Sequence, residues 1–145
     1  MNICLIGYNL TNFLLAILLS KKGFEVDIIF DEKNKSKTNN RTIGISKKNI
    51  EFLKSILNIP NQYLWPILQI EILNLKNDPS KKIKFKDKKD ENFFLIKQSD
   101  LLQLSLKKCK QLKKIKLFRY TPKETLNLEK KNHYNLIFNS QSNNI

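Results

Sequence analysis

The sequence predicts an α/β fold that begins with a βαβ unit and a parallel sheet and continues with an antiparallel hairpin or meander. Three observations predict this fold: an uncharged opening divided by Gly7, a second buried run directly after it, and later apolar runs that alternate with lysines. The chain has 145 residues, of which 41% are hydrophobic, enough for one packed domain. We therefore expect a single domain over residues 1–145, with an antiparallel segment inserted at about 65–97.

The βαβ unit is predicted from the first 30 residues. Residues 3–6 are a short buried strand, and Gly7 begins the turn into a helix of residues 10–22. Gly23 follows two lysines, which is typical of a helix C-cap facing the negative end of the helix dipole. Residues 26–30 form the second strand. Two strands joined by a helix are expected to be parallel, with a right-handed crossover.

An alternative interpretation of the opening is a membrane anchor, because residues 1–20 carry no charge and two lysines follow. Polar residues such as Asn9 and Asn12 interrupt the span, and its continuous apolar stretch covers only residues 13–19. That stretch is too short to cross a bilayer. We therefore prefer the βαβ unit.

The remaining elements follow from apolar spacing and capping residues. Residues 31–40 are polar and are expected to be a loop. A helix is expected at 47–57, with Phe52 on its inner side. The predicted strands are 41–46, 67–75, 82–86, 93–96, 115–120, 124–128 and 134–138, and the predicted helices are 47–57, capped by Ser46, and 99–112, capped by Ser99.

The charge is strongly positive: 27 Lys and Arg against 13 Asp and Glu give a net charge of +14. All but Arg41 and Arg119 are lysines, and Lys is encoded by A/T-rich codons, so base composition alone explains the excess. Recognition of phosphates and bases relies more on Arg, so a solvated surface is favoured over a nucleic-acid partner. The lysines at 81–89 and 107–116 keep open a basic peripheral protein on anionic lipid or nucleic acid.

The two cysteines, Cys4 and Cys109, lie in apolar surroundings and lack metal-ligand spacing. This pattern fits a reducing compartment, and we expect a cytoplasmic protein, with peripheral contact at the inner membrane face as an open alternative. The one histidine, His133, is expected in a surface turn. No metal site or catalytic nucleophile is predicted.

The turn at residues 7–12 occupies the place of the dinucleotide-binding pattern G-x-G-x-x-G between strand and helix. Only the first glycine is present, and Asn9 and Asn12 stand at the other two positions. In the intact motif the glycines let the backbone approach a diphosphate at the helix N-terminus. Asp31, an acid 24 residues after Gly7, stands near the place where the motif has its acidic residue and so strengthens the match. A βαβ unit that binds nothing remains the alternative.

Five segments in order resemble the flavin-dependent aromatic-ring monooxygenases, specifically the ubiquinone-biosynthesis hydroxylases. The segments are residues 1–33, RTIGIS at 41–46, Trp65-Pro66-Ile67, residues 96–102 and residues 134–144. The resemblance implies a Rossmann-like FAD-binding domain that is incomplete relative to the family. It also implies hydroxylation of a small aromatic substrate, a polyprenyl phenol, with NAD(P)H reducing FAD.

The resemblance also assigns site residues. The residues expected to bind FAD are Gly7, Asn9, Asn12, Asp31, Arg41 and Gln98. Ser140 and Gln141 stand where the family has Asp-Gly. Since the family continues well beyond this length, we expect a truncated or split enzyme, completed by a downstream chain, or a non-catalytic remnant that no longer binds FAD.

Overall fold

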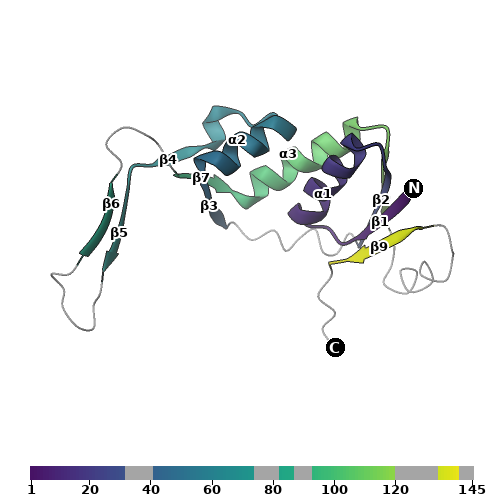
Figure 1. Cartoon of the computed structure of the whole chain (residues 1–145), viewed down its shortest axis with the longest axis horizontal. Helices are drawn as coiled ribbons and strands as arrows, with labels where there is room; N and C mark the ends of the chain where they lie inside the picture. The colour runs from purple at the N-terminus through teal and green to yellow at the C-terminus, as the bar shows by residue number, and fades with distance from the viewer. Residues whose placement is uncertain (32–40, 74–81, 87–92, 120–133, 141–145) are drawn as a thin grey trace. The chain divides into compact units, whose positions relative to one another are not determined.

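The computed structural model describes residues 1–31, 41–73, 82–86, 93–119 and 134–140. The chain divides into two compact units, the first of residues 1–41 and 98–145 and the second of residues 42–97. Figure 1 shows the elements of both units along the chain.

The first unit contains a four-stranded sheet in the order β8-β2-β1-β9, in which every neighbouring pair is parallel. Its elements are β1 (Asn2–Ile6), α1 (Leu10–Lys21), β2 (Glu25–Phe30), α3 (Gln98–Gln111), β8 (Ile115–Arg119) and β9 (Leu136–Asn139). The predicted βαβ unit is confirmed, because β1 and β2 are parallel and α1 connects them. Predicted strands 115–120 and 134–138 are confirmed as β8 and β9, with shifted ends.

Helix α1 has twelve residues between two distinct end signals. The side chain of Asn9 caps its first turn, and the chain leaves it through Gly23, whose φ of 96° suits a residue without Cβ. The membrane-anchor interpretation is wrong, because the uncharged opening folds back into a strand and a helix. Among the described residues, no helix has the length and apolar content needed to span a bilayer.

The sheet of the first unit is buried on both faces of its central strand. On one face Cys4, Ile6 and Ile29 form a cluster, against which Phe118, Tyr134 and Ile137 pack. Ile3 and Leu5 alternate to the opposite face, and helices α1 and α3 pack against each other and the sheet. The buried residues of α1 are Asn12, Phe13, Ala16, Ile17 and Ser20.

The second unit contains a three-stranded antiparallel sheet in the order β3-β7-β4 and a two-stranded antiparallel hairpin. Its elements are β3 (Thr42–Ser46), α2 (Lys47–Ile56), a 3-10 turn (Asn61–Tyr63), β4 (Trp65–Ile67), β5 (Gln69–Leu73), β6 (Lys82–Lys86) and β7 (Phe93–Lys97). Helix α2 packs on β3 and β7, and burial of Ile50, Leu53 and Ile56 provides its inner side. The α/β fold class, with separate parallel and antiparallel sheets, is thus confirmed.

Three sequence expectations need correction. Phe52 is 52% exposed and lies off the inner side of α2. Helix α3 begins at Gln98, so Ser99 lies within its first turn and is not its cap. The predicted strand 67–75 is two strands, because the chain changes partner at Leu68, with β4 pairing with β7 and β5 with β6. The expected loop at 32–40 and strand at 124–128 lie outside the described residues.

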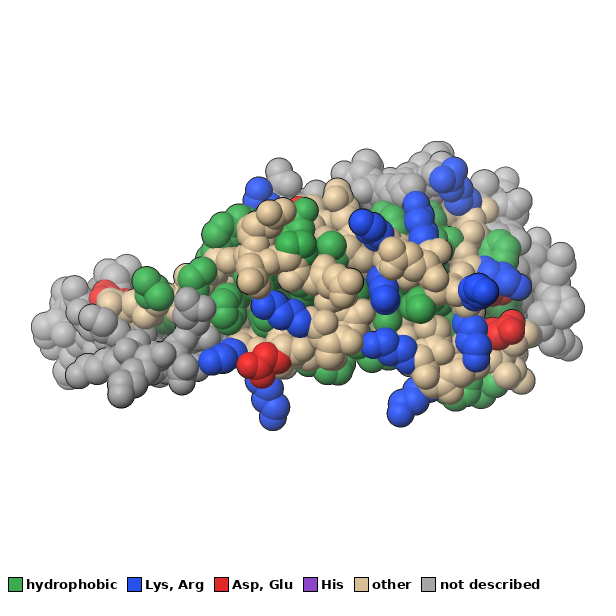
Figure 2. Space-filling model, turned by 90° about the horizontal axis from the view of Figure 1, so that it is seen from above, with side chains coloured by type: hydrophobic (Ala, Val, Ile, Leu, Met, Phe, Trp, Pro, Cys, Tyr) green, Lys and Arg blue, Asp and Glu red, His purple; other side chains and the backbone are tan. Residues whose placement is uncertain are grey.

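On the face drawn in Figure 2, the lysine and arginine side chains of the described residues are spread between apolar and neutral areas.

Candidate functional site

The turn from β1 into α1 depends on Gly7, which has a φ of 126°. A Cβ at this position would stand 2.9 Å from Ser140 Oγ, 3.1 Å from Asn9 Nδ2 and 3.3 Å from Asn12 Nδ2. The Gly7 N–H donates to the carbonyl of Ile29 at 2.8 Å, which joins the turn to the end of β2. Both the backbone conformation and the close neighbours therefore require glycine here.

Asn9 connects the helix start to the end of β9. Its Oδ1 accepts from the N–H of Asn12 at 2.9 Å, as a helix N-cap does, and its Nδ2 donates to Ser140 Oγ at 2.6 Å. The Ser140 hydroxyl donates to the Ile6 carbonyl at 3.1 Å, and the Ser140 N–H donates to the same carbonyl at 3.0 Å. Asn9 and Ser140 thereby fasten together the carboxyl ends of β1 and β9.

Asn12 is fully buried beneath the same turn. Its Nδ2 donates to the carbonyls of Ile6 and Gly7, both at 3.0 Å. Its Oδ1 is buried and has no hydrogen-bond partner within the described part of the chain. The side chain therefore fixes the path of the turn from below, where the dinucleotide motif has its third glycine.

The turn lies where open α/β sheets bind ligands. Strand β1 stands between β2 and β9. The connection from β1 runs to β2 on one side, and the chain later passes from β8 to β9 on the other side, so the carboxyl ends of β1 and β9 flank a topological switch point. The N-terminus of α1 meets this point with its positive dipole end. The Asn12 N–H is bound by Asn9, and the N–H groups of Leu10 and Thr11 are the first-turn donors that can meet an anion.

The other three predicted site residues lie elsewhere in the first unit. Asp31 directly follows β2, at the same carboxyl edge as Gly7. Arg41 is exposed, and its carbonyl accepts from the N–H of Gln98 at 2.8 Å. Gln98 is partly buried and is the first residue of α3. Three of the six predicted residues thus gather at the turn, and two others are joined by a backbone hydrogen bond.

Two residues at the turn were not among the predicted site residues. In the sequence Ser140 stands out only as a departure from the family pattern, although its place directly after β9 puts it at the ligand edge of a parallel sheet. Tyr8 packs edge-on against Phe13 and Phe30, with ring centroids 5.1 and 5.0 Å apart. Burial raises the pKa of the Tyr8 phenol above its ordinary value.

Both cysteines are buried in the first unit. Burial raises the pKa of the Cys4 thiol to about 12, with the nearby charge of Asp27 adding to the effect. Burial likewise raises the pKa of the Cys109 thiol to about 12, and its Sγ lies 3.5 Å from the carbonyl oxygen of Phe13. Thiols with such values are protonated near neutral pH, so neither can act there as a nucleophile.

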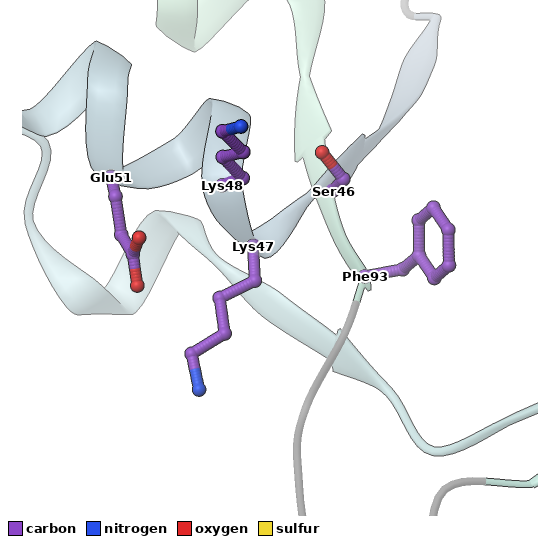
Figure 3. A pocket seen from close by; sticks show the side chains of 5 residues that line it. All are labelled: Ser46, Lys47, Lys48, Glu51 and Phe93. Carbon is purple, nitrogen blue, oxygen red and sulfur yellow. The ribbon is translucent and has the colours of Figure 1, made fainter.

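The second unit has a hollow of about 670 Å³ beside the start of α2. Ser46, Lys47, Lys48, Glu51 and Phe93 line it. Figure 3 shows these side chains pointing in different directions, with Phe93 directed away from Lys47 and Glu51. The hydroxyl of Ser46 accepts from the N–H of Asn49 at 3.4 Å and so caps the helix. The polar groups do not converge, so the turn at Gly7 is the better candidate site.

Comparison with known proteins identifies the fold. No family model matches the sequence, and no curated protein matches it. Among solved structures, the chain is similar to PqsL, described as a probable FAD-dependent monooxygenase from Pseudomonas aeruginosa, with a TM-score of 0.61 and 12% identity over 82% of this chain and 32% of that chain. The chain therefore has a flavin-monooxygenase-like fold.

Two further structures share this fold. The p-nitrophenol 4-monooxygenase PnpA from Pseudomonas putida DLL-E4 matches with a TM-score of 0.61 and 14% identity, over 81% of this chain and 31% of that chain. The tetracycline destructase Tet(51) matches with a TM-score of 0.53 and 13% identity, over 81% of this chain and 29% of that chain. The chain thus spans about a third of the length of each structure, and the flavin-monooxygenase-like fold does not single out the ubiquinone-biosynthesis hydroxylases.

Proposed function

We propose that the chain supplies the diphosphate-binding part of an FAD-binding domain in a flavin-dependent aromatic-ring monooxygenase. The observation that carries this proposal is the turn at Gly7: a glycine with positive φ leads a parallel strand into a helix N-terminus at a topological switch point. The flavin-monooxygenase-like fold supports FAD as the nucleotide.

The residues present fit a diphosphate. The α1 N-terminus offers the N–H groups of Leu10 and Thr11, and no acidic side chain lies in its first turn. Asn9 keeps one Nδ2 hydrogen beyond the one it gives to Ser140. Asn12 belongs to the proposed site as the residue that shapes the turn, since both its donor contacts are to carbonyls beneath it.

Outside the turn, Asp31 is proposed to accept from the adenosine ribose, while Arg41 and Gln98 are proposed to contact the flavin side of the nucleotide. FAD supplies the redox chemistry of ring hydroxylation when bound. Residues 1–145 are proposed to form one part of that domain, with an antiparallel insertion at about 65–97.

The finer assignment rests on the sequence resemblance. We propose NAD(P)H as the reductant, a polyprenyl phenol of ubiquinone biosynthesis as the substrate, and a further chain that completes the domain. One PqsL structure holds the aromatic compound 2-aminobenzoylacetate, which agrees with a small aromatic substrate.

A second candidate is an α/β scaffold that no longer binds a nucleotide. The observation that favours it is the internal pairing of the turn, in which the side chains of Asn9 and Asn12 donate to Ser140, Ile6 and Gly7. Because these amide groups already donate hydrogen bonds within the protein, the turn has fewer donors left for a ligand.

Nucleotide titration separates the two candidates. The purified chain is titrated with FAD by flavin fluorescence, and ADP and FMN are added as competitors. Under the first proposal FAD binds and ADP competes, while FMN competes weakly because it lacks the diphosphate. A folded chain that binds neither FAD nor ADP supports the scaffold.

The matched variants are Asn9→Asp and Ser46→Asp. Aspartate is an equally good N-cap, so both helices should keep their starts. At Asn9 it also places a negative charge against the diphosphate and should weaken FAD binding by about tenfold or more. Ser46→Asp should leave FAD binding unchanged. Equal affinity of both variants and the wild type would contradict a diphosphate at this turn.

A further inference from the structure

Lysines from two distant parts of the chain meet at one end of the parallel sheet. Helix α1 ends with Lys21 and is followed by Lys22, and both residues lie just before β2. Helix α3 ends at Gln111, and Lys113 and Lys114 lie between it and β8. Because β2 and β8 are parallel neighbours, both connections lie at the amino ends of these strands.

Hydrogen bonds join the two connections. The Nζ of Lys114 donates to the carbonyl of Gly23 at 3.0 Å, and the N–H of Val26 donates to the carbonyl of Lys114 at 2.9 Å. Lys110, in the last turn of α3, adds a further exposed ammonium group. We call the five exposed lysines at this end of the sheet the amino-end patch: Lys21, Lys22, Lys110, Lys113 and Lys114.

The composition of the chain explains how many lysines it has, but not where they gather. Among the described residues of the first unit, Glu25 is the one exposed acid, and it begins β2 beside the patch. A lysine in the last turn of a helix interacts with the helix dipole, but α2 has only Lys54 in this role. Ammonium groups are rarely buried without acidic partners, so the patch meets water or an anionic surface.

The side chains at this end favour an anionic membrane over a nucleic acid. The patch contains no arginine, whose planar guanidinium is preferred for the phosphates and bases of nucleic acids. Two partly buried apolar residues, Phe24 and Leu112, lie in the same two connections. Clustered lysines are attracted to anionic headgroups through charge alone, and apolar side chains beside them can enter the headgroup region.

We propose that the amino-end patch binds the surface of a membrane that contains anionic lipid. The turn at Gly7 lies at the carboxyl ends of the same parallel strands, so this contact leaves the candidate nucleotide site at the other end of the sheet. Membrane binding through these lysines does not require a nucleotide, so it can be tested whether or not FAD binds.

The test is cosedimentation of the full chain with vesicles of phosphatidylcholine alone or with ~30% phosphatidylglycerol, at ~100 mM NaCl. The wild type should bind the anionic vesicles at least about tenfold more tightly than the neutral ones, and ~500 mM NaCl should release it. The triple variant Lys22→Gln, Lys110→Gln and Lys113→Gln should bind the anionic vesicles more than about tenfold less tightly, because each lysine near the surface contributes to the attraction.

The matched control is the triple variant Lys47→Gln, Lys48→Gln and Lys54→Gln, which changes three exposed lysines of the second unit. Both variants remove the same amount of positive charge, so they differ in where the charge is lost. The control should bind anionic vesicles within about twofold of the wild type. Equal losses in the two variants, or a wild type that does not bind anionic vesicles, would overturn the proposal. It would also be overturned if the patch variant lost affinity for double-stranded DNA and kept its affinity for the vesicles.

A second measurement on the wild type covers the case in which a variant does not fold. Anionic vesicles should protect Lys110 and Lys113 from an acetylating reagent, and should leave Lys48 and Lys54 as reactive as they are in solution. Mass spectrometry of peptides measures the acetylation at each lysine. Equal protection of the two pairs would contradict a membrane contact at this end of the sheet.

Discussion

The helices α1 and α2 begin in the same way and end up in different surroundings. In each, a strand leads into a capping residue whose side chain accepts from the N–H of an asparagine three positions later: Asn9 and Asn12 in α1, Ser46 and Asn49 in α2. Asn12 is fully buried, whereas Asn49 is exposed. The comparison teaches that local sequence sets where a helix starts, while its place in the sheet decides whether that start can become a binding site.

The largest difference in stability should be between Gly7→Ala in the first unit and Gly44→Ala in the second. Gly7→Ala places a Cβ 2.9 Å from Ser140 Oγ in a backbone with φ of 126°. We expect the free energy of unfolding to fall by about 2–4 kcal/mol. Urea unfolding followed by far-UV circular dichroism measures the change.

Gly44→Ala is the control in the second unit, since a Cβ there meets only Leu95 Cδ2, at 4.0 Å. Its effect on stability should be within about 0.5 kcal/mol. Equal losses in the two variants would mean that the turn at Gly7 is not under steric constraint.

The next largest difference in stability should be between substitutions of Asn12 and Asn49. Asn12→Ala removes two buried hydrogen bonds, to the carbonyls of Ile6 and Gly7, and should cost about 1–3 kcal/mol. Asn49→Ala changes an exposed side chain and should cost less than about 0.5 kcal/mol. The same unfolding measurement applies. A stable Asn12→Ala variant would show that its unpartnered Oδ1 offsets the two donor bonds.

The capping residues should give a smaller contrast. Asn9→Ala removes the cap of α1 and the contact with Ser140 Oγ, and should cost about 1–2 kcal/mol. Ser46→Ala removes only a long cap bond of 3.4 Å and should cost about 0.5 kcal/mol. Ser140→Ala should reproduce part of the Asn9→Ala loss. If it has no effect, the link between β1 and β9 does not contribute to stability.

The smallest effect near neutral pH should come from the thiols. The pKa values of Cys4 and Cys109 are raised from 9.0 to about 12 in the folded chain. The folded state therefore holds these protons more tightly, and the stability they contribute is present below pH 9 and lost as pH rises toward 12. Unfolding at increasing pH should show this decline in the wild type.

The variant with both cysteines changed to alanine should lose less stability over the same pH range. Trp65 is the one tryptophan of the chain, and it lies in the second unit, which has no cysteine. Its fluorescence therefore follows the unfolding of the unit in which no thiol titrates. A wild type and a double variant with the same pH dependence would contradict the raised pKa values.

Much of the fold could be predicted because its signals are local. The run at Ile3–Ile6, the single Gly7 and the lysines before Gly23 predict β1, α1 and β2 within one or two residues. Capping by Ser46 is confirmed for the same reason. These signals depend on residues a few positions apart, which the sequence displays directly.

The errors and omissions concern contacts between distant residues. Helical spacing alone predicts Phe52 on the inner side of α2, but the packing of α2 on β3 and β7 leaves its side chain exposed. The change of partner at Leu68 depends on which strands meet, and spacing within the run cannot reveal it. The bond between Asn9 and Ser140 spans 131 positions, so the sequence predicted the turn without its neighbour across the sheet.

The central position of β1 also has a consequence for how the chain is made. Its neighbour β2 follows within 30 residues, but β9 begins at Leu136, and the Asn2 N–H bonds to Asn135 across 133 positions. During synthesis β1 must therefore wait, with one edge uncovered, until β9 emerges. Slow translation of the intervening segment would lengthen that exposure and favour pairing with the wrong strand or capture by a chaperone.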